Sequence, residues 1–356
     1  MSYLLRISTM GLLVAACTEV PALQDEGGDA DAAWTDPVKP TLEANRLLGG
    51  REDFGHVLAL GVVNDAYLLV GDDATERHLM VLDIESGEVV SRFGGHGDGP
   101  KEFRQPFRIT PDPLHPDTWW VYDFATWNWT PVSMREGPTD WTIGKRYSFN
   151  GAPIAPEKPM WAGEGVAVVH GMFSEFSVAR VSFDSDRRHV SDWSKVDYPQ
   201  PFTREDMPQE TGLRFLNRSY VAMRPSGGRF ALAYQFDNWI EVRDGGGAVV
   251  RKVRGPREAR TSYRLDESGR FHWEDDNESG YLAAYGTEGG FYLLWKGSAD
   301  GPVTTIHQFD WSGNFVREFG VDHSLLSFAV SSTGDRLWGF LRQGLPYPAI
   351  GEWVLP

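Results

Sequence analysis

The chain is poor in cysteine, because Cys17 is the only one among its 356 residues. A single thiol excludes disulfide bonds within the chain and any zinc site built from cysteine ligands. No long stretch places apolar residues at helical spacing, and no apolar run, including the one before Cys17, is long enough to span a bilayer stably. These absences argue against a helical bundle and a disulfide-stabilised domain.

Local catalytic motifs are also missing. The nine histidines are scattered, and no HExxH, GxSxG, ExxH or paired-cysteine motif occurs. The sequence therefore has no local framework for a metalloprotease, a serine hydrolase or a zinc site. Sites assembled from loops of separate repeats need no such motif. An enzyme is not excluded, but we assign no catalytic residues and no metal site.

Positive charge is scarce, and the net charge of -16 disfavours binding to phosphate backbones and anionic lipid surfaces. The one basic segment, residues 251–260 (RKVRGPREAR), has no interleaved aromatic residues. It is more typical of an exposed strand end and loop than of a nucleic-acid site. We expect no nucleic-acid partner.

What the chain has in abundance is turn-forming and aromatic residues: 39 Gly, 22 Pro and 13% aromatics. This composition favours many short strands separated by turns. In residues 306–320, Asp310 and Gly313 mark a turn between two apolar runs, which predicts a hairpin. The second arm, residues 315–319, recurs at residues 89–93 and 249–253 and, more loosely, at 189–193.

A second repeat precedes the first one along the chain. Residues 222–230 align without gaps on residues 329–337, and residues 284–292 are a third copy. Each copy reads as strand, glycine-containing turn and strand, so both repeats together predict four antiparallel strands in a row. That unit is a propeller blade.

The spacing of the repeats predicts an all-β, six-bladed propeller over residues 41–356. Five units follow from the hairpin positions, the second being a degenerate one with strands near residues 119–122 and 141–147. The last unit has three strands before the chain ends. We expect a strand near Leu42 to Leu48 to complete it, closing the ring and leaving a monomer without free sheet edges.

The first residues predict export. Residues 1–16 have one positive charge and a short apolar run, as in a signal peptide. Val14-Ala15-Ala16-Cys17 resembles the bacterial lipobox, which implies a lipid on Cys17 as the sole membrane anchor; an ordinary signal peptide is the alternative. Residues 17–40 would then be the lipidated cysteine and a disordered acidic tether. Thr18 favours the outer membrane by resemblance to enterobacterial lipoproteins.

A glycine-rich stretch lies between the first two predicted blades, at residues 93–106 (FGGHGDGPKEFRQP). It resembles the GxGxGPGEFxxP signature of bacterial TolB-like, NHL-related six-bladed propeller proteins, many of which carry a lipobox. Lys101 departs from the family's Gly. The matching residues, which we expect to cross a blade edge and fill a seam, are Gly97, Gly99, Pro100, Glu102, Phe103 and Pro106.

Two groups of residues are candidates for ligand contact. Trp119, Trp120 and Asp123 combine aromatic rings with a carboxylate, as a carbohydrate or peptide groove would, but packing between blades is the favoured interpretation of the rings. A long insertion at residues 199–216 mixes apolar anchors with charges, as partner-binding surfaces do. Its candidate contacts are Phe202, Arg204, Met207 and Phe215.

The leading hypothesis is a lipid-anchored propeller that binds an envelope protein or a small extracellular ligand. The alternative is a lactonase-like hydrolase or lyase with a metal in the central channel. Residues 275–278 (DDNE) offer oxygen ligands for Ca²⁺, but they lack the spacing of a calcium loop and read better as a solvated acidic turn. No other cofactor is indicated.

The anchor can be tested with Cys17→Ala. We expect the variant to leave the membrane fraction, because the apolar run before Cys17 is too short to hold the protein in a bilayer. Fractionation of washed membranes followed by immunodetection measures this. Retention of Cys17→Ala in those membranes would contradict lipid anchoring.

Overall fold

The computed structural model describes residues 40–49, 53–149, 156–163, 166–171, 178–184, 190–196, 218–259, 262–266, 271–274, 277–298, 301–341 and 348–356. The chain divides into two units, residues 1–35 and 36–356, and all described residues belong to the second. Every regular element among them is a β-strand. No helix in this part of the chain is long and apolar enough to cross a membrane.

Six sheets of four or five strands follow one another along the second unit. The first contains β3 (Val57–Val63), β4 (Tyr67–Asp72), β5 (Arg77–Asp83), β6 (Val89–His96) and β7 (Glu102–Phe103). The second contains β8 (Pro106–Pro111), β9 (Thr118–Asp123), β10 (Asn128–Met134), β11 (Trp141–Ile143) and β12 (Tyr147–Ser148). The third contains β13 (Pro156–Gly163), β14 (Val166–Gly171), β15 (Val178–Phe183) and β16 (Val190–Val196).

The remaining sheets follow the same plan. The fourth contains β17 (Ser219–Met223), β18 (Arg229–Tyr234), β19 (Trp239–Asp244) and β20 (Val249–Arg254). The fifth contains β23 (Glu278–Gly286), β24 (Phe291–Ser298), β25 (Thr305–Phe309), β26 (Phe315–Val321) and β1 (Thr41–Leu42). The sixth contains β27 (Ser327–Val330), β28 (Arg336–Leu341), β29 (Ala349–Val354) and β2 (Arg46–Leu48); a separate hairpin pairs β21 (Tyr263–Leu265) with β22 (Phe271–Trp273).

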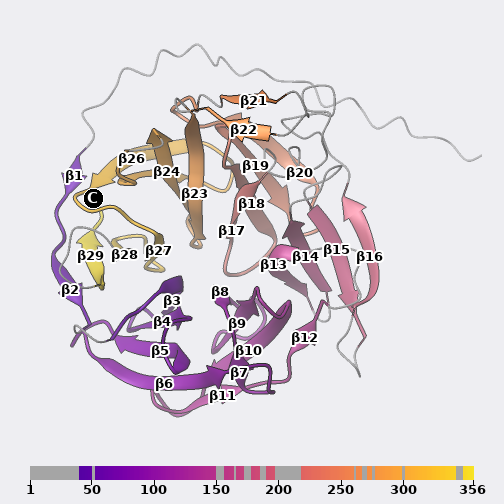
Figure 1. Ribbon diagram of the computed structural model, residues 1–356, viewed down its shortest axis with the longest axis vertical. Coiled ribbons are helices and arrows are strands. Elements are labelled where there is room, and N and C mark those ends of the chain that lie inside the picture. Colours follow the sequence, from indigo (N-terminus) through magenta and orange to yellow (C-terminus); the bar gives the residue numbers. More distant parts are fainter. Residues whose placement is uncertain are drawn as a thin grey trace, which may run out of the picture. The chain divides into compact units, whose positions relative to one another are not determined.

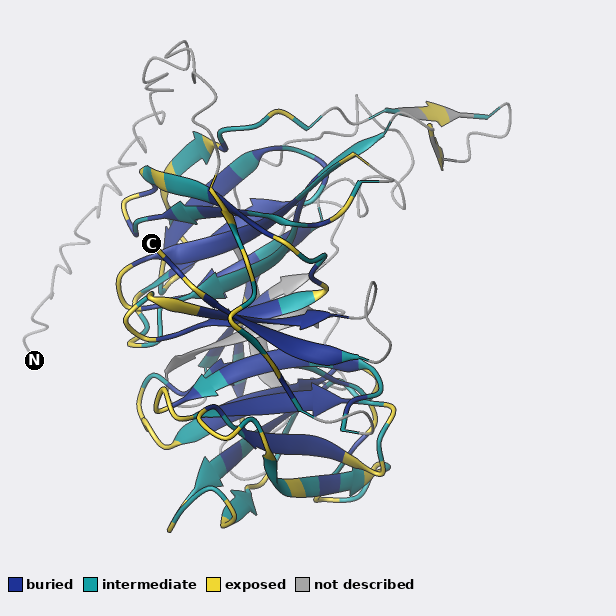
Figure 2. Ribbon diagram, turned by 90° about the vertical axis from the view of Figure 1, so that its left-hand side faces the viewer, coloured by how far each residue is buried: buried dark blue, intermediate teal, exposed yellow. Residues whose placement is uncertain are grey.

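The sheets form a β-propeller arrangement. Consecutive strands within a sheet pair antiparallel, except that β7 pairs with β6 in parallel and β12 pairs with β10. The sheets stand around a common axis with their first strands innermost (Figure 1). Figure 2 shows the buried residues concentrated in the strands and the exposed ones in the turns. The all-β propeller expected from the repeats is therefore present.

The core consists of six apolar clusters, each lying between two sheets. Strand side chains alternate between the two faces, so one strand supplies two clusters. In β9, for example, Val121 belongs to the cluster shared with the first sheet and Tyr122 to the cluster shared with the third. The clusters join sheets one to two, two to three, and so on, and the last joins the sixth sheet to the first.

The N-terminal segment completes the last sheet, as the sequence indicated. Strand β2 pairs antiparallel with β29, with Leu47 opposite Gly351. The expectation of one closing strand over Leu42 to Leu48 was wrong in one respect, because β1 pairs in parallel with β26 of the fifth sheet. The N-terminal segment therefore pairs with strands of both the fifth and the sixth sheet and links these two sheets.

The hairpin predicted around Asp310 is present between β25 and β26. The Asp310 carboxylate accepts hydrogen bonds from the backbone N–H groups of Ser312 and Asn314, at 2.8 and 2.9 Å. Gly313 has φ of 80°, a conformation that costs side-chain-bearing residues free energy. In the second repeat, Gly227 and Gly334 occupy equivalent turns with φ of 76° and 75°.

Gly313→Val should lower the free energy of unfolding by roughly 1 to 3 kcal/mol, because a β-branched residue is strained at positive φ. An added Cβ there would make ordinary van der Waals contact with Arg251 and Val242, each at 3.4 Å. Gly289→Val is the matched control: this turn glycine has open space around it and no positive φ. Denaturant unfolding of both variants measures the difference, and equal stabilities would contradict the assigned turn.

A buried polar network lies in the fifth sheet. The Glu318 carboxylate accepts two hydrogen bonds from Arg257, both 2.7 Å, and lies 2.9 Å from His307 Nε2. His307 Nδ1 is 3.2 Å from the Tyr281 hydroxyl. Burial raises the pKa of Glu318, but the hydrogen bonds from Arg257 and His307 outweigh it and lower the pKa to about 2.

The lowered pKa of Glu318 predicts acid sensitivity. Its contribution to stability is complete above its ordinary pKa of 4.5 and is lost as the pH falls toward about 2. Glu318→Gln should therefore cost up to about 3 kcal/mol at pH 7 and much less near pH 3. Thermal unfolding of both proteins across this range checks the prediction, and a difference independent of pH would contradict it.

Candidate functional site

The innermost strand of each sheet leaves one edge unpaired. Strands β3, β8, β13, β17, β23 and β27 each pair with one neighbour only and stand at the end of their sheets. Their free edges carry backbone N–H and C=O groups that face the axis of the ring (Figure 1). These groups need partners from other strands, from water or from a ligand.

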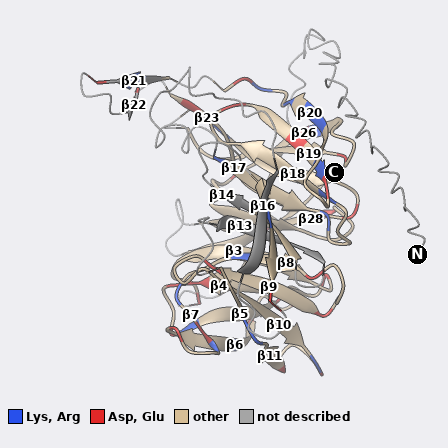
Figure 3. Ribbon diagram, turned by 90° about the vertical axis from the view of Figure 1, so that its right-hand side faces the viewer, with Lys and Arg blue, Asp and Glu red and all other residues tan. Residues whose placement is uncertain are grey.

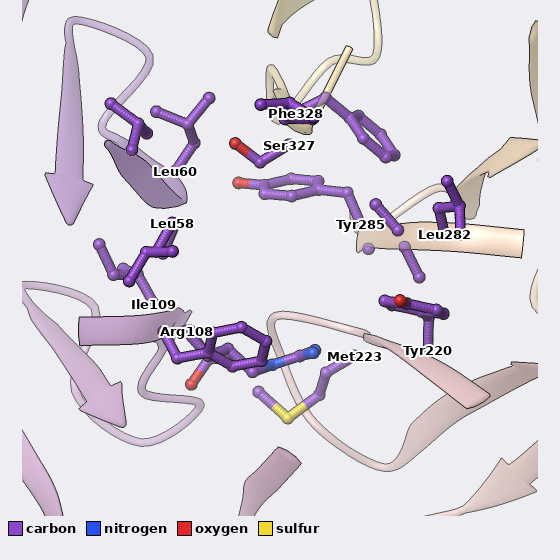
Figure 4. Close-up of a pocket in the computed structure, with 18 of the residues that line it drawn as sticks. Leu58, Leu60, Arg108, Ile109, Tyr220, Met223, Leu282, Tyr285, Ser327 and Phe328 are labelled. Carbon is purple, nitrogen blue, oxygen red and sulfur yellow. The ribbon is translucent and has the colours of Figure 1, made fainter. Parts of the chain in front are cut away.

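A cavity of about 410 Å³ lies on this axis, within the size range of small-molecule sites. Five of the inner strands line it, and Figure 4 shows their side chains converging from opposite sides. The walls are mostly apolar. The labelled lining residues are Leu58, Leu60, Arg108, Ile109, Tyr220, Met223, Leu282, Tyr285, Ser327 and Phe328.

Arg108 is the notable polar residue of the cavity. Its guanidinium reaches from β8 to β17, where Nη2 donates a hydrogen bond to the Val221 carbonyl. Among the described residues, no carboxylate forms an ion pair with it, and Nε has no hydrogen-bond partner. Burial alone lowers the pKa of Arg108 to about 10, so it stays cationic at neutral pH.

Tyr285 makes a second contact across the axis. Its hydroxyl accepts a hydrogen bond from the Val62 N–H at 3.3 Å, joining β23 to the free edge of β3. Burial raises the pKa of Tyr285 to about 12, so the hydroxyl remains neutral at physiological pH. Arg108 and Tyr285 thus satisfy free-edge groups of strands in other sheets.

A second cavity, of about 510 Å³, shares Pro111, Tyr285 and Gly286 with the first. It lies among the turns that leave the inner strands, and it is lined by prolines, Trp119 and several carboxylates. These carboxylates are engaged locally. Asp65 accepts hydrogen bonds from Ser332, and Glu288 accepts them from Ser226 and Arg224.

Charged side chains lie mainly at turns, strand ends and outer strands (Figure 3). The basic stretch predicted to be a strand end begins in β20, where Arg251, Lys252 and Arg254 are exposed or half-buried. Lys252 and Arg254 lie over the ring of Trp239 at 4.4 and 4.2 Å. These side chains therefore serve contacts within the protein.

In the part of the chain that the structure describes, no group of three or more His, Cys, Asp or Glu residues is placed to hold a metal ion. Of the proposed calcium turn, Asp275 and Asp276 lie outside the described residues. The metal-dependent alternative therefore remains a hypothesis without assigned ligands.

The structure does not bring the two candidate tryptophans together. Trp119 and Trp120 are 3% and 4% exposed. As neighbours in β9 they point to opposite faces, Trp119 into the cluster with the first sheet and Trp120 into the cluster with the third. One groove cannot use both rings. Both rings pack between sheets, as the sequence favoured, and Trp119 also borders the second cavity.

Asp123 caps the loop that leads into the second sheet. Its carboxylate, which is buried, accepts hydrogen bonds from the backbone N–H groups of Arg104, Gln105, Ala125 and Thr126, at 2.7 to 3.3 Å. The proposed ligand-binding carboxylate is therefore occupied by the protein's own backbone.

The glycine-rich signature forms the crossing between the first two sheets. Phe103 is buried in the cluster that these sheets share. Glu102 accepts a hydrogen bond from the Gly99 N–H at 2.7 Å, and a Cβ at Gly97 would lie 2.3 Å from the same carboxylate. Pro106 begins β8, while Pro100 lies exposed in the turn. Every contact assigned to this stretch is structural.

Five other predicted residues lie outside the described part of the chain: Cys17, Phe202, Arg204, Met207 and Phe215. Sequence reasoning missed Arg108 and Tyr285. One signal was available for Arg108, since an arginine in the first strand of a predicted blade is an unusual choice for a position near the axis.

Comparison with known proteins shows the fold. No family model matches the chain, and no curated protein matches it. A member of the DUF4221 family from Bacteroides vulgatus has a TM-score of 0.57 and 10% identity, with 89% of this chain and 98% of that chain covered. A predicted exported protein from Bacteroides fragilis has a TM-score of 0.53 and 14% identity, with 87% and 94% covered. At these identities the likeness concerns the fold alone.

The capping role of Asp123 can be tested directly. Asp123→Ala should lower the free energy of unfolding by about 2 kcal/mol, because buried N–H groups lose a charged acceptor. Asp123→Asn should lose less, since its amide oxygen still accepts. Asp117→Ala, at an exposed turn of the same sheet, is the control. Chemical denaturation measures all three, and an Asp123→Ala protein as stable as the control would reopen a binding role.

Proposed function

We propose that this protein is a lipid-anchored, extracytoplasmic binding protein whose propeller has six blades and takes a small ligand in the central cavity. The six sheets of four or five strands supply the blades. The cyclic set of six apolar clusters supports the closure of the ring. The glycine-rich signature supports kinship with TolB-like, NHL-related propellers.

Two observations support the location. The lipobox-like Val14-Ala15-Ala16-Cys17 supports a lipid on Cys17, and the tether that follows would hold the propeller outside the cytoplasm. One structure of the same fold belongs to a predicted exported protein. On the basis of Thr18, we propose the outer membrane as the location of the anchored protein.

The central cavity is the observation that carries the binding role. It is concave, largely apolar and supplied with a few polar groups, which are the features of small-molecule sites. It also lies where residues from five different sheets meet, so a ligand there contacts a rigid frame. The strand interiors are occupied by packing, which leaves this cavity and the loops for recognition.

An envelope protein bound through residues 199–216 is the second candidate partner, resting on the apolar and charged residues of that segment. The lactonase-like hydrolase or lyase remains the enzymatic alternative. We favour the small ligand because the cavity is the feature that the described residues build.

The cavity can be filled with Ala284→Phe, since Ala284 is a small, half-buried residue of its wall. Native mass spectrometry of the full chain purified from its own cell envelope should show a non-covalent small molecule that Ala284→Phe lacks. Ala248→Phe, in an exposed outer turn, is the matched control and should keep the ligand. A wild-type chain without ligand, or a ligand retained by a folded Ala284→Phe protein, would contradict the proposal.

A further inference from the structure

The described lining of the central cavity differs in charge from the protein as a whole. The chain carries a net charge of -16. Yet the described residues that line this cavity include two arginines, Arg108 and Arg218, and no aspartate or glutamate. A cavity lined in this way attracts anions into an otherwise acidic molecule.

Among the described residues, no carboxylate supplies a counter-charge to the half-buried Arg108. A guanidinium has five N–H donors, and Arg108 gives one hydrogen bond to the Val221 carbonyl. That bond holds the side chain across the axis without neutralising it. A buried charge without a partner of opposite sign is costly, and proteins keep such groups mainly where a ligand completes them.

Two hydroxyl groups of the lining are also unsatisfied. Thr110 Oγ1 and Ser327 Oγ are buried and have no hydrogen-bond partner among the described residues, and neither has Arg108 Nε. All three side chains belong to residues that line the cavity, from β8 and β27, but these three atoms are themselves covered by protein. Most of the remaining wall is apolar, and Leu58, Met223 and Phe328 approach the same space (Figure 4).

We propose that the central cavity binds an organic anion with an apolar body, whose carboxylate or phosphate group pairs with Arg108. This inference rests on the proposed binding function and specifies its ligand. The guanidinium offers paired N–H donors to two oxygens of the headgroup, and the leucine, methionine and phenylalanine side chains cover the apolar part. The cavity of about 410 Å³ suits one such molecule.

The test compares ligands that differ only in the headgroup, titrated calorimetrically into the purified full chain. The eight-carbon series is octanoate, octyl phosphate, 1-octanol and octylamine. The aromatic series is 3-phenylpropionate, 3-phenylpropanol and 3-phenylpropylamine. In at least one series an anion should bind about tenfold or more tightly than the alcohol, since charged hydrogen bonds exceed neutral ones. The amine should bind most weakly. Octanoate against octyl phosphate tells which headgroup fits.

Two variants assign the preference to Arg108. Arg108→Met keeps an apolar side chain of similar length and should bring anion and alcohol to within about twofold of each other. Arg108→Lys keeps the charge and should retain part of the preference. Circular dichroism and thermal unfolding establish that both variants are folded, so that loss of binding reports the site.

The outcomes separate this inference from the proposed function. If alcohol and anion bind the wild-type chain equally, or if Arg108→Met keeps the preference for the anion, the charge-based recognition is wrong while a small-ligand cavity stands. If no compound of either series binds and the envelope-purified chain carries no small molecule, the binding function fails together with this inference.

Discussion

The structure depends on one constraint: both faces of every sheet are apolar. In β9 the residues Trp119 to Tyr122 alternate between two clusters, and each of the other five blade sheets likewise contributes residues to two clusters. A sheet of this kind must be covered on both sides, and a row of such sheets has no exposed end only when it closes on itself. Closure is made by β2 on β29, with Leu48 buried in the cluster that joins the sixth sheet to the first. Arg46 adds polar contacts at this seam, to Glu352 of the sixth sheet and to the carbonyls of Ile84 and Glu85.

Closing the ring covers the apolar faces of the sheets, but it leaves the backbone edges of the inner strands unpaired around the axis. The inner strands cannot pair with one another, so their backbone edges surround a space that side chains fill only partly. Arg108 and Tyr285 satisfy two of these backbone groups by reaching across to other sheets. Their polar ends are thereby fixed by the fold itself. A ligand that meets Arg108 encounters a group already oriented, which reduces the entropy lost on binding.

The sequence allowed the repeating elements to be predicted because they are local. The turns at Asp310 to Gly313 and the copies of the second repeat depend on residues a few positions apart, and strand pairing follows from them. The β2 pairing could be inferred because the last unit had one strand too few. By contrast, the cavity joins Leu58, Arg108, Tyr220, Tyr285 and Ser327, which are separated along the chain, and no local pattern links them. The separation of Trp119 from Trp120 was within reach, since the two-residue period of a strand puts neighbours on opposite faces.

The central claim is that the Arg108 cation binds the anionic group of an external ligand in the central cavity. A crystal structure of the full chain purified from its own cell envelope tests it most directly. We expect electron density for a small molecule in the cavity, with an anionic group within hydrogen-bond distance of the Arg108 guanidinium and an apolar part against Met223 and Phe328. An Arg108 side chain paired with a carboxylate of its own chain, in a cavity closed by protein side chains, would contradict it.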